Sequence, residues 1–516
     1  MRSRAGRSLD PSRRQNLKGA LVITPLVIFG LLVAALIPLL PLKLIVLIVG
    51  AIVGLLFLLL GIENLLLATV AVCLVLIGPI EYFLGIRVIW LYSGLALLVA
   101  FKSALNLVGD RRAPVAASHR GSLSAVLVLL VVFFGAQFMV TLLQRPSTNL
   151  LIVELRDSLL PWLLLLPFLA GQVSIQGCRR LWKLVVWIGF LQLPMVLIQY
   201  LLFARKRMDT TWWDAIVGTF IGNPQAGGDS GAMAMYVISV AAFLIAAWRV
   251  GSLSGRNLAV LLPLALASLF LSEVKIALVL IPLTVVALYW VDIVRRPVVG
   301  LGVLGATAIL VISIHLVYGS VFYETRAGAG TTESTLDFAF NANFIKANGE
   351  MGRFAALYYW WNHGGDALGP VAYAFGNGIG ASNADNLLDL GPIARRVYPL
   401  HIAATGVTKL LWDAGIVGLG SFSALLILLF VRARAMARQV ESATDKSLAL
   451  GFSAMLLMAL AHMFYTPAVT GHTPQIYMLL VVLTGTMFAM DRLTGKASAT
   501  VPSPPARCQP VLSRAW

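Results

Sequence analysis

The amino-acid sequence predicts an all-α, polytopic membrane protein with about 14 transmembrane helices, in a range of about 12 to 14, and one large outer loop. Two observations predict this class. The 516 residues are 59% hydrophobic and only 12% charged, whereas soluble domains carry about 25% charged residues. The apolar residues also fall into runs of about 20, the length that spans a bilayer as a helix. An ordinary soluble enzyme is thereby excluded.

The apolar runs give the order of the elements. We expect spans at residues 20–40, 44–60, 64–84, 88–105, 122–143, 157–174, 184–204, 231–248, 258–272, 274–292, 298–318, 403–430, 447–465 and 474–490. The first run follows a basic stretch but lacks a cleavage site of small residues, so we expect it to be retained as a span rather than removed as a signal peptide. The resulting organisation is a basic arm (1–19), eleven spans (20–318), a large loop (319–402), three spans (403–490) and a disordered tail (491–516).

The formal net charge of +17 is explained by topology rather than by a nucleic-acid partner. With a cytoplasmic N-terminus, 25 of the 39 Lys and Arg residues fall on cytoplasmic segments, as the positive-inside rule requires. Both termini are then cytoplasmic and loop 319–402 lies outside. Arg205, Lys206 and Arg207 are the exception, and an inverted local topology remains an alternative there.

The outer loop is too long to be only a connector. It carries cations at Arg353, Arg395 and Arg396, and His401 follows at its end. Each arginine is either a clamp for an anion or a solvated loop charge. An imidazole titrates near neutral pH, so His401 is either an acid/base group or a helix cap.

Aromatic residues of the loop are candidate sugar-binding groups. Tyr359 and Trp360, in the run 358–361, can stack on the apolar faces of sugar rings, whereas Trp212 and Trp213 are better explained by the interfacial aromatic belt. Lys275 stands beside Glu273 at the outer end of a span, where an ionisable group is a functional candidate by default. The alternative is a lysine that reaches the lipid headgroups.

The most specific local pattern is a glycine-rich stretch at 214–231, directly before a span. Gly218, Gly222 and Asn223 predict a tight turn whose backbone can approach a ligand closely. The free N–H groups of the following helix suit an anion such as a diphosphate. The alternative is a turn whose small residues let helices pack closely. The three cysteines have no paired spacing and no metal-binding motif is present, so we expect neither disulfide nor metal site.

These motifs resemble those of the O-antigen ligase and polysaccharide polymerase superfamily. The stretch Gly218-Thr-Phe followed by Gly222-Asn-Pro-Gln resembles its turn signature. Three further segments match in the expected order: Ser272-Glu-Val-Lys275, Gly352-Arg353 followed by the aromatic run and Phe375-Gly-Asn-Gly-Ile-Gly380, and Trp412-Asp-Ala-Gly-Ile-Val-Gly418. Together the matches cover roughly residues 205–430.

The resemblance implies a fold and an activity. It implies a GT-C-like glycosyltransferase of the bacterial inner membrane that makes an inverting, metal-independent transfer at the periplasmic face. The substrate would be a lipid-linked oligosaccharide on undecaprenyl diphosphate, with no separate cofactor, and a chain-length regulator and a flippase would be pathway partners. In that role, Lys275, Arg353, Arg395 and Arg396 bind the diphosphate and His401 acts on the acceptor.

One departure bears on the type of enzyme. The ligase pattern places a histidine eleven residues before the first glycine of the last motif, but Ala404 stands there and His401 lies three residues earlier. This favours a repeat-unit polymerase for a surface or secreted polysaccharide. The alternatives are an O-antigen ligase that transfers glycan to lipid A core and, from another class, a lipid-linked oligosaccharide flippase.

Overall fold

The computed structural model describes residues 54–109, 122–144, 146–206, 215–225, 227–272, 274–318, 332–384 and 390–499. The chain forms two units, Met1–Leu60 and Gly61–Trp516. In the first unit the described part is 54–60, of which 54–59 are helical. All the other described residues belong to the second unit. The predicted span 20–40, most of the span 44–60, Trp212 and Trp213 lie outside the described residues.

The described residues are almost entirely helical. The first half contains α3 (Ile62–Val75), α4 (Ile77–Leu84), α5 (Ile89–Gly109), α6 (Ser122–Gln144), α7 (Thr148–Ser158), η2 (Leu160–Leu165), α8 (Leu166–Leu169), α9 (Ile175–Leu202), η3 (Ala204–Lys206), β1 (Gly222–Asn223) and β2 (Gly227–Gly228). The second half contains α10 (Ser230–Arg249), α11 (Gly255–Ser272), α12 (Ala277–Arg295), α13 (Pro297–Tyr318), α14 (Thr332–Phe340), α15 (Arg353–His363), α16 (Pro370–Phe375), α17 (Pro392–Val397), α18 (Gly406–Gln439), α19 (Ala443–His462), η6 (Pro467–Thr470) and α20 (Pro474–Ala499).

Ten helices in the described residues are long and apolar enough to cross a membrane, which makes the chain a polytopic membrane protein. They fall on ten of the predicted spans. The predicted span 298–318 is the helix α13, whose apolar stretch Gly300–Ser313 is shorter than the others. The number of spans predicted from the sequence is therefore confirmed only in part.

The predicted span 157–174 is wrong as a single helix. The end of α7, η2 and α8 divide this range into short pieces, with Pro161 and Pro167 near the starts of η2 and α8. Proline lacks the N–H that a continuous helix requires, and its ring obstructs the preceding turn. The apolar side chains still face the interior, because Trp162, Leu164 and Phe168 are buried.

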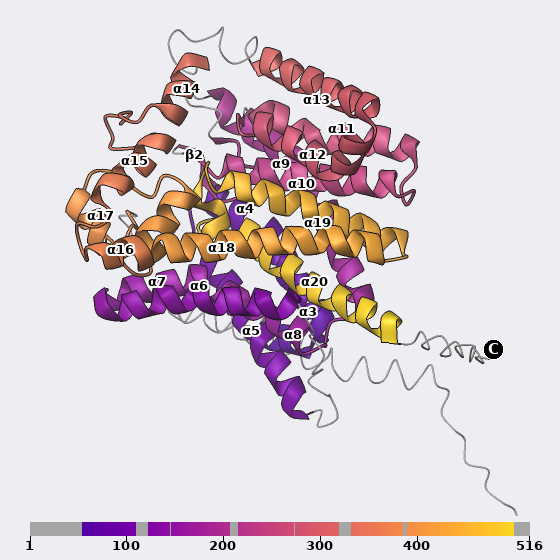
Figure 1. The fold of residues 1–516 in the computed structure, drawn as a ribbon, viewed down its shortest axis with the longest axis horizontal. Coiled ribbons are helices and arrows are strands. Elements are labelled where there is room, and N and C mark those ends of the chain that lie inside the picture. Colours follow the sequence, from indigo (N-terminus) through magenta and orange to yellow (C-terminus); the bar gives the residue numbers. More distant parts are fainter. Residues whose placement is uncertain are drawn as a thin grey trace, which may run out of the picture. The chain divides into compact units, whose positions relative to one another are not determined.

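The long helices pack side by side. In Figure 1, α18 and α19 run next to each other, and α18 also packs on α6 while α19 packs on α10. The N-termini of α10, α18 and α20 meet the C-terminus of α19, because the Val407 N–H donates to Met463 O and Thr473 Oγ1 donates to Asp229 Oδ2. We call this the loop end, since α15 and α16 pack on α18 there and α14 packs on α15.

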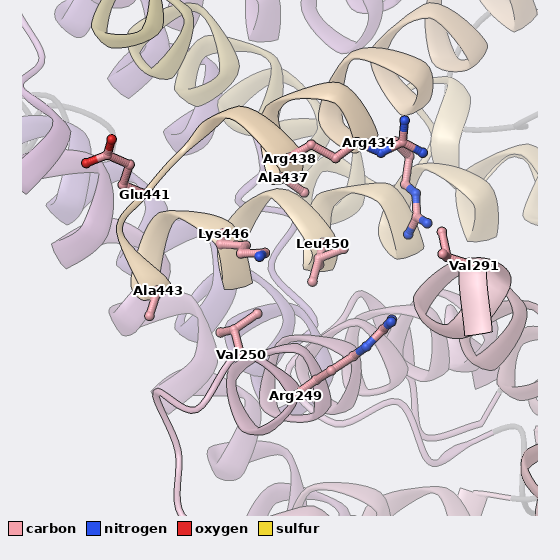
Figure 2. Close-up of a pocket in the computed structure, with 10 residues that line it drawn as sticks. All are labelled: Arg249, Val250, Val291, Arg434, Ala437, Arg438, Glu441, Ala443, Lys446 and Leu450. Atoms are coloured by element: carbon pink, nitrogen blue, oxygen red, sulfur yellow. The ribbon is translucent and has the colours of Figure 1, made fainter. Parts of the chain in front are cut away.

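The other ends of the same helices meet at what we call the opposite end. There Arg249 of α10 pairs with Asp292 of α12, and a cavity of about 550 Å³ lies between α10, α12, α18 and α19 (Figure 2). Helix α9 runs from this end, where Arg179 pairs with Asp445, to the loop end, where Gln199 holds the backbone at Gly218. The residues after α9, Arg205 and Lys206, thus follow its loop end, which argues against the inverted alternative.

Candidate functional site

The glycine turn before α10 is held by two buried glutamines of α9. Gln199 accepts hydrogen bonds from the N–H groups of Val217 and Gly218 at 2.9 and 2.8 Å and donates to Gly218 O at 2.8 Å. Gln192 accepts from the Thr219 N–H at 2.9 Å and donates to Thr219 Oγ1 at 2.7 Å. The protein itself therefore satisfies the backbone polar groups that a ligand would use.

Gly218 is required for a steric reason. Its φ is +62°, which favours glycine, and a Cβ atom there would lie 2.2 Å from Gln192 Oε1. Beyond it, Gly222 is buried in the short pairing of β1 with β2, and the exposed Asn223 accepts a hydrogen bond from the Gln225 N–H at 2.7 Å. For Gly218 and Gly222 this geometry favours the packing explanation over direct ligand contact.

Gly231, at the end of the glycine-rich stretch, contacts residues at the end of α19. A Cβ at Gly231, in the first turn of α10, would lie 2.7 Å from the Tyr465 ring and 3.5 Å from His462 Nε2. The start of α10 thus lies against the residues that end α19. Free N–H groups at a helix start favour negative charge.

Arg353, the first residue of α15, is held at the loop end by two aromatic rings and a backbone carbonyl. Its guanidinium carbon lies 4.7 Å from the ring centre of Phe338 and 4.9 Å from that of Tyr465. Its Nη1 reaches the carbonyl of Ala404 at 3.5 Å, and its Nε is buried without a hydrogen-bond partner among the residues that the structure describes. The cation is thus oriented by two aromatic faces and keeps an unused donor.

His462 is a second buried polar group of this region. It is 0% exposed, its ring centre lies 5.7 Å from that of Tyr465, its Nδ1 lies 3.4 Å from Thr466 Oγ1, and the ring lies against the backbone of Gly231. Gln475, also 0% exposed, leaves both amide atoms without partners within the described part of the chain. Buried polar groups almost always have partners, so an exception of this kind is a candidate contact for a polar ligand.

Lys275 approaches the same region through α14. It lies in the break between α11 and α12, and its Nζ donates to Thr335 Oγ1 at 2.7 Å. Thr335 and Phe338 are three residues apart on α14 and so share one face of that helix. Because Phe338 also contacts Arg353, both predicted cations touch the same face of α14.

His401 lies beside these residues but is exposed. Its backbone N–H donates to Gly349 O at 2.9 Å, and it forms an isolated parallel bridge with Glu350. Glu350 accepts from Lys346 Nζ at 2.7 Å. The backbone of His401 is therefore fixed against Glu350, which lies three residues before Arg353 at the start of α15. The side chain of His401 is exposed to solvent.

The structure does not bring the remaining candidates into this group. Arg395 and Arg396 are exposed on α17, and Arg395 turns back to Leu390 O at 3.4 Å. Trp360 is 3% exposed and packs edge-on against Tyr373, which corrects its predicted role: a ring covered by protein cannot stack on a sugar. Tyr359 is half-buried with its ring 4.5 Å from that of His363. Burial, together with the Asp366 carboxylate, raises the pKa of Tyr359.

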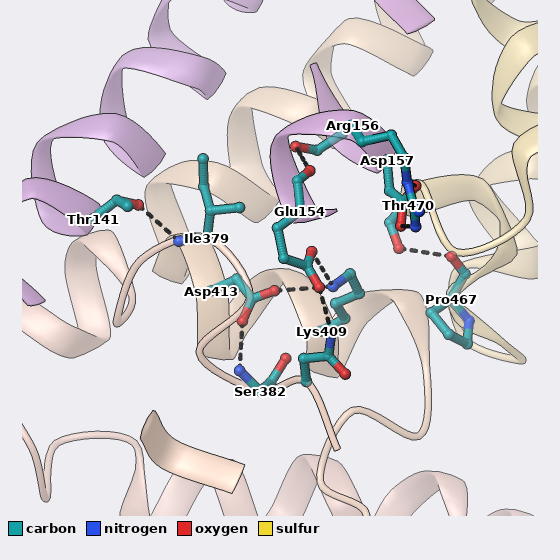
Figure 3. A network of polar contacts seen from close by, with 12 residues as sticks. Thr141, Glu154, Arg156, Asp157, Ile379, Ser382, Lys409, Asp413, Pro467 and Thr470 are labelled. Atoms are coloured by element: carbon teal, nitrogen blue, oxygen red, sulfur yellow. Dashed lines mark hydrogen bonds and ion pairs between the residues drawn. The ribbon is translucent and has the colours of Figure 1, made fainter. Parts of the chain in front are cut away.

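The sequence reasoning missed a buried ionic cluster, shown in Figure 3. Lys409 Nζ lies 3.4 Å from Glu154 Oε2 and 3.2 Å from Asp413 Oδ2. Asn383 donates to Glu154 Oε1 at 2.7 Å, and the Ser382 N–H donates to Asp413 Oδ1 at 2.9 Å. The cluster joins α7 and α18 to the segment 376–383. Two charges four residues apart within the apolar run 403–430 were the available signal.

The same segment explains the last of the resemblance motifs. Helix α18 is kinked at Gly415, where φ is 65° and ψ is −165°. The interrupted turn frees carbonyls that pair with the segment 376–383: Asn377 N–H donates to Trp412 O at 2.8 Å, and Gly378 N–H donates to Asp413 O at 3.0 Å. The motif therefore shapes the start of α18 as a dock for the outer loop.

No group of three or more His, Cys, Asp or Glu residues that could hold a metal ion occurs among the described residues. Cys73 and Cys178 are buried free thiols. Compared with known proteins, the chain matches no family model, and no curated protein matches it. The function proposed below therefore rests on the resemblance of the motifs and on the geometry of the loop end.

Proposed function

We propose that the chain is a glycosyltransferase that polymerises undecaprenyl diphosphate-linked oligosaccharide repeat units into a surface or secreted polysaccharide. The reaction would occur at the periplasmic face of the inner membrane. The observation that carries the proposal is Arg353, held between Phe338 and Tyr465 at the loop end with a buried Nε that has no partner in the described residues. A planar guanidinium suits a phosphate group.

A diphosphate-linked donor needs cations where its leaving group departs. Arg353 and Lys275, which both touch α14, would bind and neutralise the diphosphate. The start of α10 at Gly231 adds N–H groups to the same region. These groups stabilise the charge that develops as the bond from the sugar C1 to the phosphate oxygen breaks and the diphosphate leaves with the electron pair.

The acceptor hydroxyl must be positioned and lose a proton. In this proposal the hydroxyl oxygen attacks C1, and an imidazole takes the proton. His401 has an exposed ring next to the segment that begins α15, so it is open to an acceptor arriving from solvent. The outer position of the cations and the long loop above them support a transferase over a flippase, which would need charges along an interior path.

The test is an elongation assay with the purified full chain and lipid-linked repeat units. We expect Arg353→Ala to reduce elongation by about 10²-fold or more, because it removes a preorganised charge at the leaving group. Arg87→Ala is the matched control, since Arg87 is an exposed arginine between α4 and α5 whose side chain is 53% exposed. The unfolding temperatures of both variants separate misfolding from loss of chemistry.

Three results would count against the proposal in different ways. Full elongation by Arg353→Ala would remove Arg353 from the site. Transport of the lipid-linked unit without elongation would indicate the flippase. In cells, long lipid-linked polymer that is not attached to lipid A core after deletion would indicate the ligase, whereas accumulated single repeats would support the polymerase.

A further inference from the structure

The cavity at the opposite end is unlike the loop end in its chemistry. Four cationic side chains line it, Arg249 from α10, Arg434 and Arg438 from α18, and Lys446 from α19, against one acidic side chain, Glu441. Its other lining residues are apolar: Val250, Val291, Ala437, Ala443 and Leu450. Figure 2 shows the Arg249 guanidinium extending from α10 toward the arginines of α18. The lining is thus cationic and apolar together.

The cations are only partly neutralised within the described residues. Arg249 pairs with Asp292 and lies 4.8 Å from the ring centre of Tyr289. Arg434 Nη1 donates to Ala287 O at 2.7 Å, and its charge is opposed by those of Arg249 and Arg438 and favoured by that of Asp292. Like charges held together repel unless an anion is shared between them. The arrangement therefore favours a bound anion.

Two tryptophans beside the cavity indicate that it lies at the level of the lipid headgroups. Trp248 precedes Arg249 and is 43% exposed, and Trp290 precedes Val291 and is 57% exposed. Exposed tryptophans at helix ends mark the interface between lipid and water. The cavity is also at the end that the distribution of Lys and Arg assigns to the cytoplasm, and basic pockets between transmembrane helices at that face suit acidic headgroups.

We propose that this cavity binds the phosphate group of an anionic ligand, and that an anionic phospholipid of the inner leaflet supplies it. The guanidinium groups of Arg434 and Arg438 and the Lys446 ammonium contact the phosphate, while the apolar lining residues contact the glycerol and the first methylenes of the acyl chains. The site is independent of the proposed glycosyl transfer, which uses the loop end.

The test is a titration of the purified full chain, in neutral detergent, with phosphatidylglycerol, phosphatidylcholine or inorganic phosphate. A ligand that binds only the folded state raises the unfolding temperature, and native mass spectrometry counts the lipids bound. We expect phosphatidylglycerol to bind and to raise this temperature. The double variant Arg438→Gln and Lys446→Gln should bind it about tenfold more weakly or worse, because two charge-assisted contacts are lost.

Arg438 and Lys446 are both exposed, so this variant removes charge with little effect on packing. The matched control is Arg295→Gln with Arg296→Gln, two exposed arginines at the end of α12 that do not line the cavity. A response to inorganic phosphate that disappears in the cavity variant would support a phosphate site filled from solution. Equal binding of both lipids, unchanged binding by the cavity variant, or equal loss in the control would overturn the proposal.

Discussion

Charged side chains inside the apolar part of the chain are neutralised residue by residue. Lys409 lies one turn into α18, which is otherwise apolar at this point, and its ammonium is shared by two carboxylates that are 6% and 5% exposed, Glu154 and Asp413. Taking such charges out of water costs several kcal/mol for each ion, and only close pairing offsets the cost. Removing one partner therefore harms the fold more than the pair helps it.

We expect Lys409→Met to destabilise the chain by about 3–5 kcal/mol, because it leaves two buried carboxylates without a cation. The measurement is unfolding in detergent followed by circular dichroism. Lys183→Met is the control, since Lys183 is exposed on α9 and should change stability by less than about 0.5 kcal/mol. Adding Glu154→Gln to Lys409→Met should recover part of the loss. A loss for Lys409→Met no larger than for the control would contradict the ionic role.

At the scale of elements, the kink of α18 and the outer segment 376–383 depend on each other. A Cβ at Gly415 would lie 2.5 Å from the backbone of Ala374, and one at Gly376 would lie 2.4 Å from the backbone of Asp413 and Ala414. The two glycines allow a helix and a loop to cross backbone against backbone. The crossing is what lets Asp413 receive the Ser382 N–H at 2.9 Å.

Gly415→Ala should destabilise the chain by about 3 kcal/mol or more. Its backbone conformation is nearly restricted to glycine, at about 1–3 kcal/mol for any other residue, and the added methyl group has no space. Gly420→Ala, in the same helix with nothing within 4 Å of its Cβ, should be neutral or stabilise by up to about 1 kcal/mol. Thermal unfolding of both variants compares them; equal stability would show that the kink relaxes without cost.

The long helices could be predicted because a membrane span requires apolar side chains along about 20 consecutive residues. Ten apolar runs become helices of span length, since hydrocarbon requires each backbone group to bond within its own helix. The broken range 157–174 could not be predicted by hydropathy, which does not distinguish a buried irregular segment from a span. Pro161 and Pro167 indicate the breaks, but a hydropathy averaged over about 20 residues does not reveal them.

The candidate site could be predicted only residue by residue. Arg353 and Lys275 stay predictions that rest on their place in the loop and at the outer end of a span, and nothing local distinguishes Arg353 from Arg395. That distinction comes from Phe338 and Tyr465, which are far apart in sequence and meet only in the fold. For the same reason the burial of His462 against Tyr465 is visible only in the structure.

At the scale of the whole molecule, the charges at the helix ends predict which end faces the cytoplasm. The loop end carries α14 to α17 and the opposite end carries the cationic cavity, so the positive-inside rule predicts that the cavity lies at the cytoplasmic face of the membrane. Cys73 and Cys178 are 0% exposed and should not react with a charged maleimide. A single new cysteine in a Cys508→Ser background therefore reports one position at a time.

Asp366 is exposed between α15 and α16. We expect Asp366→Cys to react with a membrane-impermeable maleimide in cells whose outer membrane has been removed and whose inner membrane is intact. Ser252→Cys, at an exposed position between α10 and α11, should react only after the membrane is permeabilised, because it lies at the end with the cationic cavity. Both positions should label fully once permeabilised, which controls for reactivity. Labelling of Ser252→Cys before permeabilisation would show that the orientation is the reverse of the predicted one. The proposed transferase site would then face the cytoplasm and the proposed phosphate site would face the periplasm, which contradicts both proposals.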